Sequence, residues 1–310
     1  MKMLNADAFQ ASRLFIETTA RPLEVARFRH AFDGAPAGVV LQALSDFRNT
    51  DGGFGQALEP DLRAPESSVL CTSAAFQILR SLETPPDHDL VSSGIGFLLK
   101  HLDREQGGWR IIPETADNSP CAPWWCQEDR KESFESFSLN PAAEVLGYLY
   151  DNQERVPEES LALVSQRVLR ELNGLEKIEM HDLICCLRLL RTTTLPQEYR
   201  IGVRTKLKEL IAGTVACDPE QWAGYSLRPL QVVDDPQSPF MEGLEDAVAA
   251  NLDYEIASQN DDGSWTPTWS WDDTFPEAWA KAEKEWSGII TVANLLTLER
   301  FGRIEAPNAK

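Results

Sequence analysis

The stretch that decides the fold is Gln259-Asn260-Asp261-Asp262-Gly263-Ser264-Trp265, a glycine turn closed by an aromatic residue. Two related turns precede it: Asn49-Thr50-Asp51-Gly52-Gly53-Phe54-Gly55 and Gln106-Gly107-Gly108-Trp109. Phe54 and Trp109 are 55 positions apart, and the separation of Trp109 from Trp265 equals three further steps of about 52. A repeat of this length predicts one pair of helices per unit and five or six pairs along the chain.

The turn has a physical function in each copy. Glycine releases the backbone from the end of a helix through a positive φ, and the aromatic ring then folds back over that end. Glutamine or aspartate side chains bind the backbone groups left unpaired there. We therefore expect these residues to be structural. They are Gly53, Phe54, Gln106, Gly108, Trp109, Gln259, Gly263 and Trp265.

Helical periodicity dominates the rest of the chain. Apolar residues recur at helical spacing over 91–102, 161–175 and 180–190, whereas no run alternates as a strand does. Asn140-Pro141 predicts an N-cap opening a helix over 142–150, and the apolar stretch Ile289–Leu298 predicts a helix buried all round. Proline-rich loops are expected over 110–139 and 218–239. The predicted class is all-α, as a single domain over 1–310.

Composition limits the functions that the chain can have. The 310 residues carry 29 Lys and Arg against 49 Asp and Glu, a net charge of −20 that argues against nucleic-acid and anionic-membrane partners. No window is apolar enough to span a membrane, and the N-terminus lacks the apolar core of a signal peptide, so we expect a cytoplasmic protein. The six cysteines are expected to be free thiols. A metal pair at Cys121 and Cys126 is the alternative, but no histidine has matching spacing, so we predict neither metal nor cofactor.

The turns resemble the QW motif of squalene and oxidosqualene cyclases, in the Gln-x-x-x-Gly-x-Trp of Gln259, Gly263 and Trp265. The shorter Asp-Gly-Gly-Phe and Gln-Gly-Gly-Trp versions are similar to turns in that superfamily, which includes protein prenyltransferase β-subunits. The resemblance implies an (α/α)5–6 toroid whose inner helices line a central cavity. The zinc ligands of the prenyltransferases have no counterpart, because Val69 stands two residues before Cys71.

The same resemblance points to a catalytic segment. Asp272, Asp273 and Thr274 match the last three positions of the Asp-x-Asp-Asp-Thr motif of class II terpene cyclases, and Ser270 replaces the first aspartate. In that family an aspartic acid protonates an alkene or epoxide, and it needs an apolar site to stay protonated. The alternative is a helix N-cap leading into Phe275-Pro276.

Aromatic residues crowd around this segment. Trp269, Trp271, Trp279 and Trp286 are candidates to line a cavity, where their π faces would stabilise a carbocation, stack on sugars or pack a core. His181 is a candidate proton-transfer residue, with a helix cap or a satisfied core histidine as the alternatives. Asp61 is a candidate acid at a cavity mouth or part of a surface turn.

Three functions remain open on these residues. The first is an acid-initiated cyclase or transferase acting on an isoprenoid in an aromatic cavity. The second is a carbohydrate-active lyase or hydrolase using paired carboxylates. The third is a non-catalytic toroid that binds a small apolar, isoprenoid-like ligand or a partner subunit.

Overall fold

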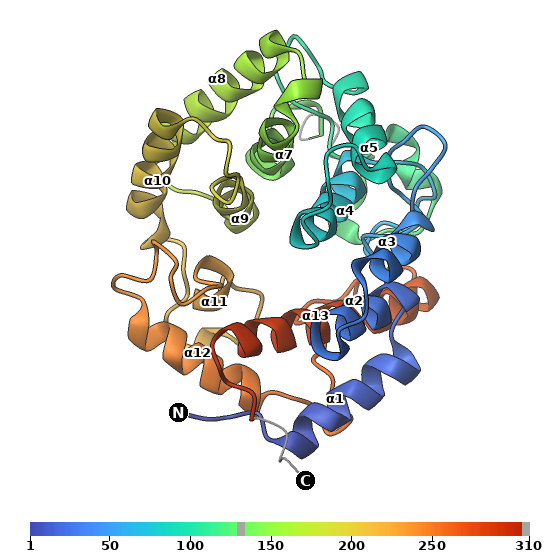
Figure 1. Cartoon of the computed structure of the whole chain (residues 1–310), viewed down its shortest axis with the longest axis vertical. Coiled ribbons are helices and arrows are strands. Elements are labelled where there is room, and N and C mark those ends of the chain that lie inside the picture. The colour runs from blue at the N-terminus through green and yellow to red at the C-terminus, as the bar shows by residue number, and fades with distance from the viewer. Residues whose placement is uncertain (129–133, 306–310) are drawn as a thin grey trace. The chain divides into compact units, whose positions relative to one another are not determined.

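The computed structural model describes residues 1–128 and 134–305, and these residues fold as 12 α-helices without a β-strand (Figure 1). The all-α class predicted from the sequence is confirmed. The chain divides into two compact units: unit 1 comprises Met1–Ala43 and Val215–Lys310, and unit 2 comprises Leu44–Thr214. Helix α3 (Ala37–Ser45) runs across the boundary. The single domain over 1–310 stays a prediction.

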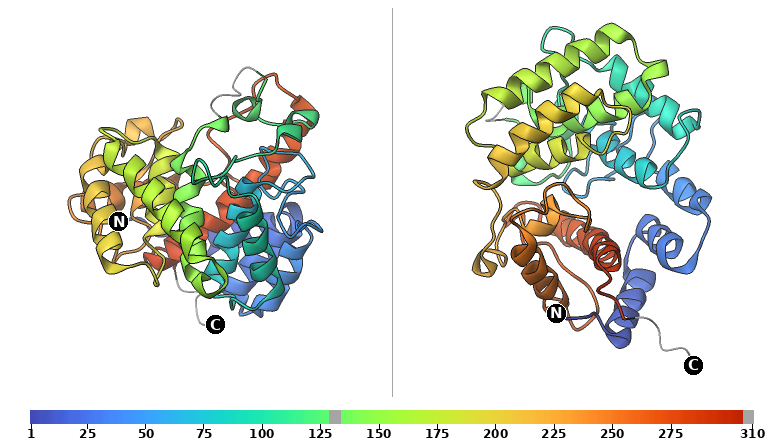
Figure 2. Two further views of the ribbon diagram at one scale, coloured as in Figure 1. Left: turned by 90° about the horizontal axis from the view of Figure 1, so that it is seen from above. Right: turned by 60° about the vertical axis from the view of Figure 1, so that its left-hand side comes forward.

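Six helices of unit 2 pack as two layers (Figures 1 and 2). The inner layer holds α4 (Val69–Ser81), α7 (Leu139–Asp151) and α9 (Met180–Leu189). The outer layer holds α5 (Asp89–Lys100), α8 (Glu158–Gly174) and α10 (Gln197–Ile211). Each outer helix follows the inner helix on which it packs, α5 on α4, α8 on α7 and α10 on α9, so unit 2 is built from three sequential hairpins.

Sequence patterns account for most of these helices. The predicted segments 91–102, 161–175 and 180–190 correspond to α5, α8 and α9. Helix α4 begins where the Ser68 side chain accepts a hydrogen bond from the backbone N–H of Cys71 at 3.0 Å. This N-cap supplies an acceptor for one of the unpaired donors in the first helical turn.

Helix α7 is the most deeply buried helix of unit 2. Every residue from Pro141 to Tyr150 is buried, because α4, α8 and α9 cover it on three sides. The predicted helix over 142–150 forms, but Asn140 does not cap it. Asn140 has non-helical backbone angles, the Asn140–Pro141 peptide bond is cis, and the Ser138 hydroxyl accepts from the Asn140 N–H at 3.1 Å.

Unit 1 combines both ends of the chain. Its helices are α1 (Ala6–Thr19), α2 (Pro22–Asp33), α11 (Pro229–Val232), α12 (Glu245–Ala257) and α13 (Pro276–Arg300). Helices α1 and α2 pack on α13, and α11 packs on α12. Leu4 pairs with Ile304 in a parallel bridge, in which the Leu4 N–H donates to the carbonyl of Arg303 at 2.8 Å.

Helix α13 corrects one prediction. The stretch 289–298 was expected to be buried on every side, yet Ala293 is exposed and Ile289 and Ile290 are half-buried. The apolar pattern extends around the helix, but α1 and α2 are the helices of unit 1 that pack on it most closely, so only part of its surface is covered within that unit.

The three glycine turns share one backbone hydrogen bond. In each, a backbone N–H bonds across the turn at 2.9 Å: Asn49 to Gly53, Asp103 to Gly108, and Asn260 to Ser264. The indole N–H of Trp109 donates to the carbonyl of Leu98 at 2.7 Å, and that of Trp265 to the carbonyl of Glu255 at 2.8 Å. Each tryptophan therefore ties its turn back to the preceding helix.

The first and third turns also share a bond to the next helix. The Phe54 N–H donates to the Thr72 hydroxyl of α4 at 3.0 Å, and the Trp265 N–H donates to the Thr291 hydroxyl of α13 at 3.1 Å. The Gln259 amide donates to Ser12 of α1 at 2.8 Å. These bonds fix each turn against a helix that lies outside it.

No helix among the described residues is both long and apolar enough to cross a membrane.

Candidate functional site

The predicted catalytic segment lies at the start of α13, in unit 1. Asp272 and Asp273 are both exposed, and Thr274 is half-buried. The Ser270 hydroxyl donates to Asp272 Oδ1 at 2.9 Å. Since solvent stabilises the ionised form of a carboxyl, these surroundings do not supply the apolar site that a protonated acid needs.

The N-cap interpretation of this segment also differs from the structure. Helix α13 begins with Pro276 at its first position, and its N-cap residue is Phe275, without a side-chain capping bond. Asp272 and Phe275 both have a positive φ, at 49° and 46°. For residues other than glycine such backbone angles are costly, so packing of the surrounding chain holds the segment in this shape.

The predicted tryptophans form two contacting groups. Trp269 lies edge-on between Tyr225, at a centroid distance of 5.7 Å, and Trp286 of α13, at 5.2 Å. Trp271, which is fully buried, contacts Trp279 at 5.7 Å. We call Tyr225, Trp269 and Trp286 the aromatic cluster. Tyr225 is exposed and both tryptophans are half-buried, so the cluster presents ring surface to solvent.

His181 and Asp61 belong to unit 2 and lie on separate elements. His181 stands in the first turn of α9, with 42% of its side chain exposed, and its Nδ1 is 2.9 Å from Glu179. Asp61 is buried in the loop before α4, and its carbonyl accepts from the Ala122 N–H at 2.8 Å. Thus His181 is not a core histidine, and Asp61 is not on an exposed turn.

A buried polar network in the inner layer of unit 2 was missed by the sequence analysis. Glu144 of α7 has 2% of its side chain exposed, and it accepts from the Tyr148 hydroxyl and from Arg188 Nη1, the latter at 2.9 Å. Burial and the neighbouring Glu144 carboxylate raise the pKa of Tyr148 well above its usual value. Tyr148 therefore stays protonated and donates its hydroxyl to the carboxylate.

Arg80 extends the network to α4. Its guanidinium lies over the Tyr148 ring, 4.4 Å from the centroid, and pairs with Asp151 of α7 at 2.6 Å. It also donates to the backbone carbonyl of Arg188 at 3.0 Å. Charged groups from three helices thus pair with one another inside the layer. The only sequence signal was a pair of charged residues, Glu144 and Arg188, within apolar helical stretches.

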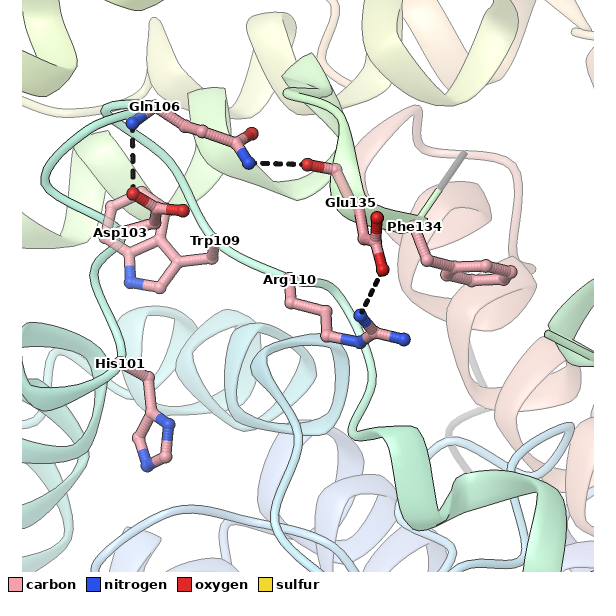
Figure 3. Close-up of a pocket in the computed structure, with 7 residues that line it drawn as sticks. All are labelled: His101, Asp103, Gln106, Trp109, Arg110, Phe134 and Glu135. Atoms are coloured by element: carbon pink, nitrogen blue, oxygen red, sulfur yellow. Dashed lines mark hydrogen bonds and ion pairs between the residues drawn. The ribbon is translucent and has the colours of Figure 1, made fainter. Parts of the chain in front are cut away.

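A pocket of about 220 Å³ opens beside the second glycine turn of unit 2 (Figure 3). Its lining residues are His101, Asp103, Gln106, Trp109, Arg110, Phe134 and Glu135. The Gln106 side chain donates to the carbonyl of Glu135 at 2.6 Å, and the Arg110 guanidinium faces the Glu135 carboxylate at 4.0 Å. Gln106 and Trp109, predicted as turn residues, therefore also line the pocket.

The potential metal ligands do not cluster in the described part of the chain. No three or more His, Cys, Asp or Glu residues there are arranged to hold a metal ion. Cys121 and Cys126 come together, with 3.7 Å between their sulfur atoms.

The chain was compared with known protein families, curated proteins and solved structures. None of them matches it.

Proposed function

We propose that the protein is a terpenoid-cyclase-like α/α toroid built from hairpin repeats of about 52 residues. Two features support this proposal. Unit 2 consists of three sequential hairpins with their first helices in one layer. The glycine turns, which belong to both units, share one hydrogen-bond pattern, so each unit carries the same kind of joint.

The function that we propose is binding of a small apolar, isoprenoid-like ligand at the aromatic cluster. The observation that best supports this proposal is the arrangement of three aromatic rings. Trp269 stands edge-on to both Tyr225 and Trp286, and all three residues keep solvent-exposed surface. Burying such surface against a hydrocarbon chain is favourable, by about 25 cal/mol per Å². The neighbouring α13 residues Ile289 and Ile290 add half-buried apolar surface.

Binding can be tested by titrating the full chain with farnesol and geranylgeraniol and following tryptophan fluorescence. We expect saturable quenching, and replacing Trp286→Leu should raise Kd by roughly 3–10-fold because one aromatic contact is lost. Leu14→Ala is the matched control, since Leu14 is an exposed apolar residue of the same unit. An unchanged Kd for Trp286→Leu would contradict the proposal. Saturable binding of an oligosaccharide in place of the isoprenoids would favour the carbohydrate function.

Acid-initiated chemistry on the bound ligand is the second candidate. The observation that favours it is the backbone of the Asp272–Phe275 segment, in which two non-glycine residues have positive φ next to the aromatic cluster. Strained backbone of this kind concentrates at functional sites. The Ser270 hydroxyl bound to Asp272 would take the place of the motif's first aspartate. A bound hydrocarbon covering Asp272 would supply the apolar surroundings that the exposed segment lacks on its own.

Product analysis separates the two candidates. The protein is incubated with farnesol, geranylgeraniol and squalene, and extracts are examined by gas chromatography with mass spectrometry. A cyclised product that disappears in Asp272→Asn supports catalysis, whereas binding without product supports a non-catalytic toroid.

A further inference from the structure

The sulfur atoms of Cys121 and Cys126 lie 3.7 Å apart, close to van der Waals contact. The residues between them include the 3₁₀ turn Pro123–Trp125, which folds the chain back and brings its two ends together. We propose that Cys121 and Cys126 are a redox-modifiable dithiol, which a peroxide oxidises to an intramolecular disulfide. This modification site is independent of the proposed ligand function.

The two thiols differ in their accessibility. Cys121 is buried, and its backbone is fixed by a bridge to Leu62 and by the Ala122 N–H, which donates to the carbonyl of Asp61 at 2.8 Å. Cys126 is half-buried, and its thiol donates to the Ala122 carbonyl at 3.8 Å. An oxidant therefore reaches the Cys126 sulfur first.

The other four cysteines are placed differently. Cys71, Cys185 and Cys186 are buried, whereas Cys217 is exposed. The close contact between cysteine sulfur atoms joins positions 121 and 126. Cys217 accordingly reports generic surface oxidation, and the buried three report opening of the fold.

The chemistry balances with one equivalent of hydrogen peroxide. The Cys126 thiolate attacks one peroxide oxygen, the O–O bond breaks, and the sulfur becomes a sulfenic acid as hydroxide leaves and takes up the thiol proton to form water. The Cys121 sulfur then attacks the sulfenic sulfur, the S–O bond breaks, and a second water leaves with the Cys121 proton. Burial, together with the Cys126 sulfur, raises the pKa of Cys121 to about 12, so Cys121 remains a thiol until this second step.

Oxidation would act on residues beside the pocket. A disulfide needs a sulfur separation of about 2.05 Å, so the Cys126 side of the loop has to move toward Cys121. Gln127 follows directly and is buried, where its side chain accepts from Arg110 and donates to the carbonyl of Pro113 at 2.9 Å. Arg110 lines the pocket, and Gln127, which accepts a hydrogen bond from Arg110, is the residue next to Cys126.

The test treats the folded full chain with hydrogen peroxide, removes the excess, and alkylates the denatured protein with N-ethylmaleimide for peptide mass spectrometry. We expect two of the six cysteines to escape alkylation, in a peptide that holds 121 and 126 and has lost two hydrogen atoms. Dithiothreitol should restore both thiols. In Cys121→Ser, dimedone should trap a sulfenic acid at Cys126, and Cys217→Ser should behave as wild type.

Two results would overturn the proposal. One is full alkylation of Cys121 after Cys126 has been oxidised to sulfinic or sulfonic acid, because the buried thiol then does not resolve the intermediate. The other is a disulfide that links molecules through Cys217 while Cys121 and Cys126 both remain open to alkylation. Circular dichroism shows whether Cys121→Ser folds as the wild type does. If it folds poorly, Cys126→Ser replaces it in the test, because Cys126 is only half-buried. In Cys126→Ser no cysteine should escape alkylation.

Discussion

Glu144 is a carboxylate inside the most buried helix of unit 2, and its position depends on two partners. Arg188 and Tyr148 both donate to it, so its charge is compensated within the inner layer. A buried ion pair contributes little net stability when both partners are present, but removal of one partner leaves the other uncompensated. The residue is therefore a sensitive probe of the network.

Replacing Glu144→Ala should lower the free energy of unfolding by about 3 kcal/mol, near the low end of the range for a broken buried pair. The low end applies because 31% of the Arg188 side chain is exposed and water solvates part of it. Urea unfolding followed by circular dichroism measures the change. The double variant Glu144→Leu with Arg188→Met should recover most of the loss. An equally unstable double variant would contradict this account of the network.

Asp182 gives a pH-dependent prediction. Burial raises its pKa, although the Asn140 N–H donates to Oδ1 at 2.8 Å and favours the charged form. A carboxyl whose folded pKa exceeds its unfolded value, about 3.9, binds protons more tightly when folded. Its contribution to stability therefore falls as the pH rises from that value through the folded pKa.

Asp182→Asn should raise the melting temperature at pH 7, because it removes the desolvated charge and keeps an oxygen acceptor for Asn140. The gain should shrink near pH 3.5, where the wild-type carboxyl is largely protonated. Scanning calorimetry at both pH values measures it. Asp182→Ala is the control that loses the acceptor, and its melting temperature should fall. A lower melting temperature for Asp182→Asn at pH 7 would mean that the ionised carboxylate stabilises the fold.

Among the structural elements, the glycine turns permit the sharpest comparison. Gly263 has a φ of 87°, and a Cβ at this position would lie 2.2 Å from the carbonyl carbon of Ala11 in α1. Gly34, which ends α2, has a φ of 69°, and a Cβ there would meet no atom within 4 Å. An alanine would therefore adopt an unfavourable backbone conformation at either position. At position 263 its Cβ would also clash with the backbone of α1.

We expect Gly34→Ala to cost about 1–2 kcal/mol, the usual penalty for a left-handed alanine. Gly263→Ala should cost clearly more, because α1 has to move away from the turn. Urea midpoints of the two variants supply the comparison. Equal losses would mean that the third turn does not depend on its close approach to α1.

The sequence predicted elements better than it predicted the environment of single residues. The turns were found because glycine and an aromatic residue must occur together where a helix ends, and this requirement is local. The Glu144–Arg188 pair joins residues 44 positions apart. Such a pair cannot be predicted without knowing that α7 packs on α9. The exposure of Asp272 was equally hidden, since a matching motif does not specify burial.

For the whole molecule, the decisive quantity is the excess of acidic residues, 49 against 29 basic ones. Several arginines are already paired, among them Arg13 with Asp33, Arg228 with Glu255, and Arg303 with Asp253. The remaining acids outnumber the available cations, so like-charge repulsion opposes the compact state. Screening should therefore stabilise this protein, although it weakens the individual surface pairs.

The melting temperature should rise by a few degrees when sodium chloride is increased from about 10 mM to 150 mM, as the Debye length falls from about 30 to 8 Å. Differential scanning fluorimetry at pH 7 measures the rise. Choline chloride should give the same result, because screening depends on ionic strength and not on the identity of the cation. A rise with sodium alone would indicate a bound cation. A fall with both salts would mean that the arginine ion pairs outweigh the general repulsion.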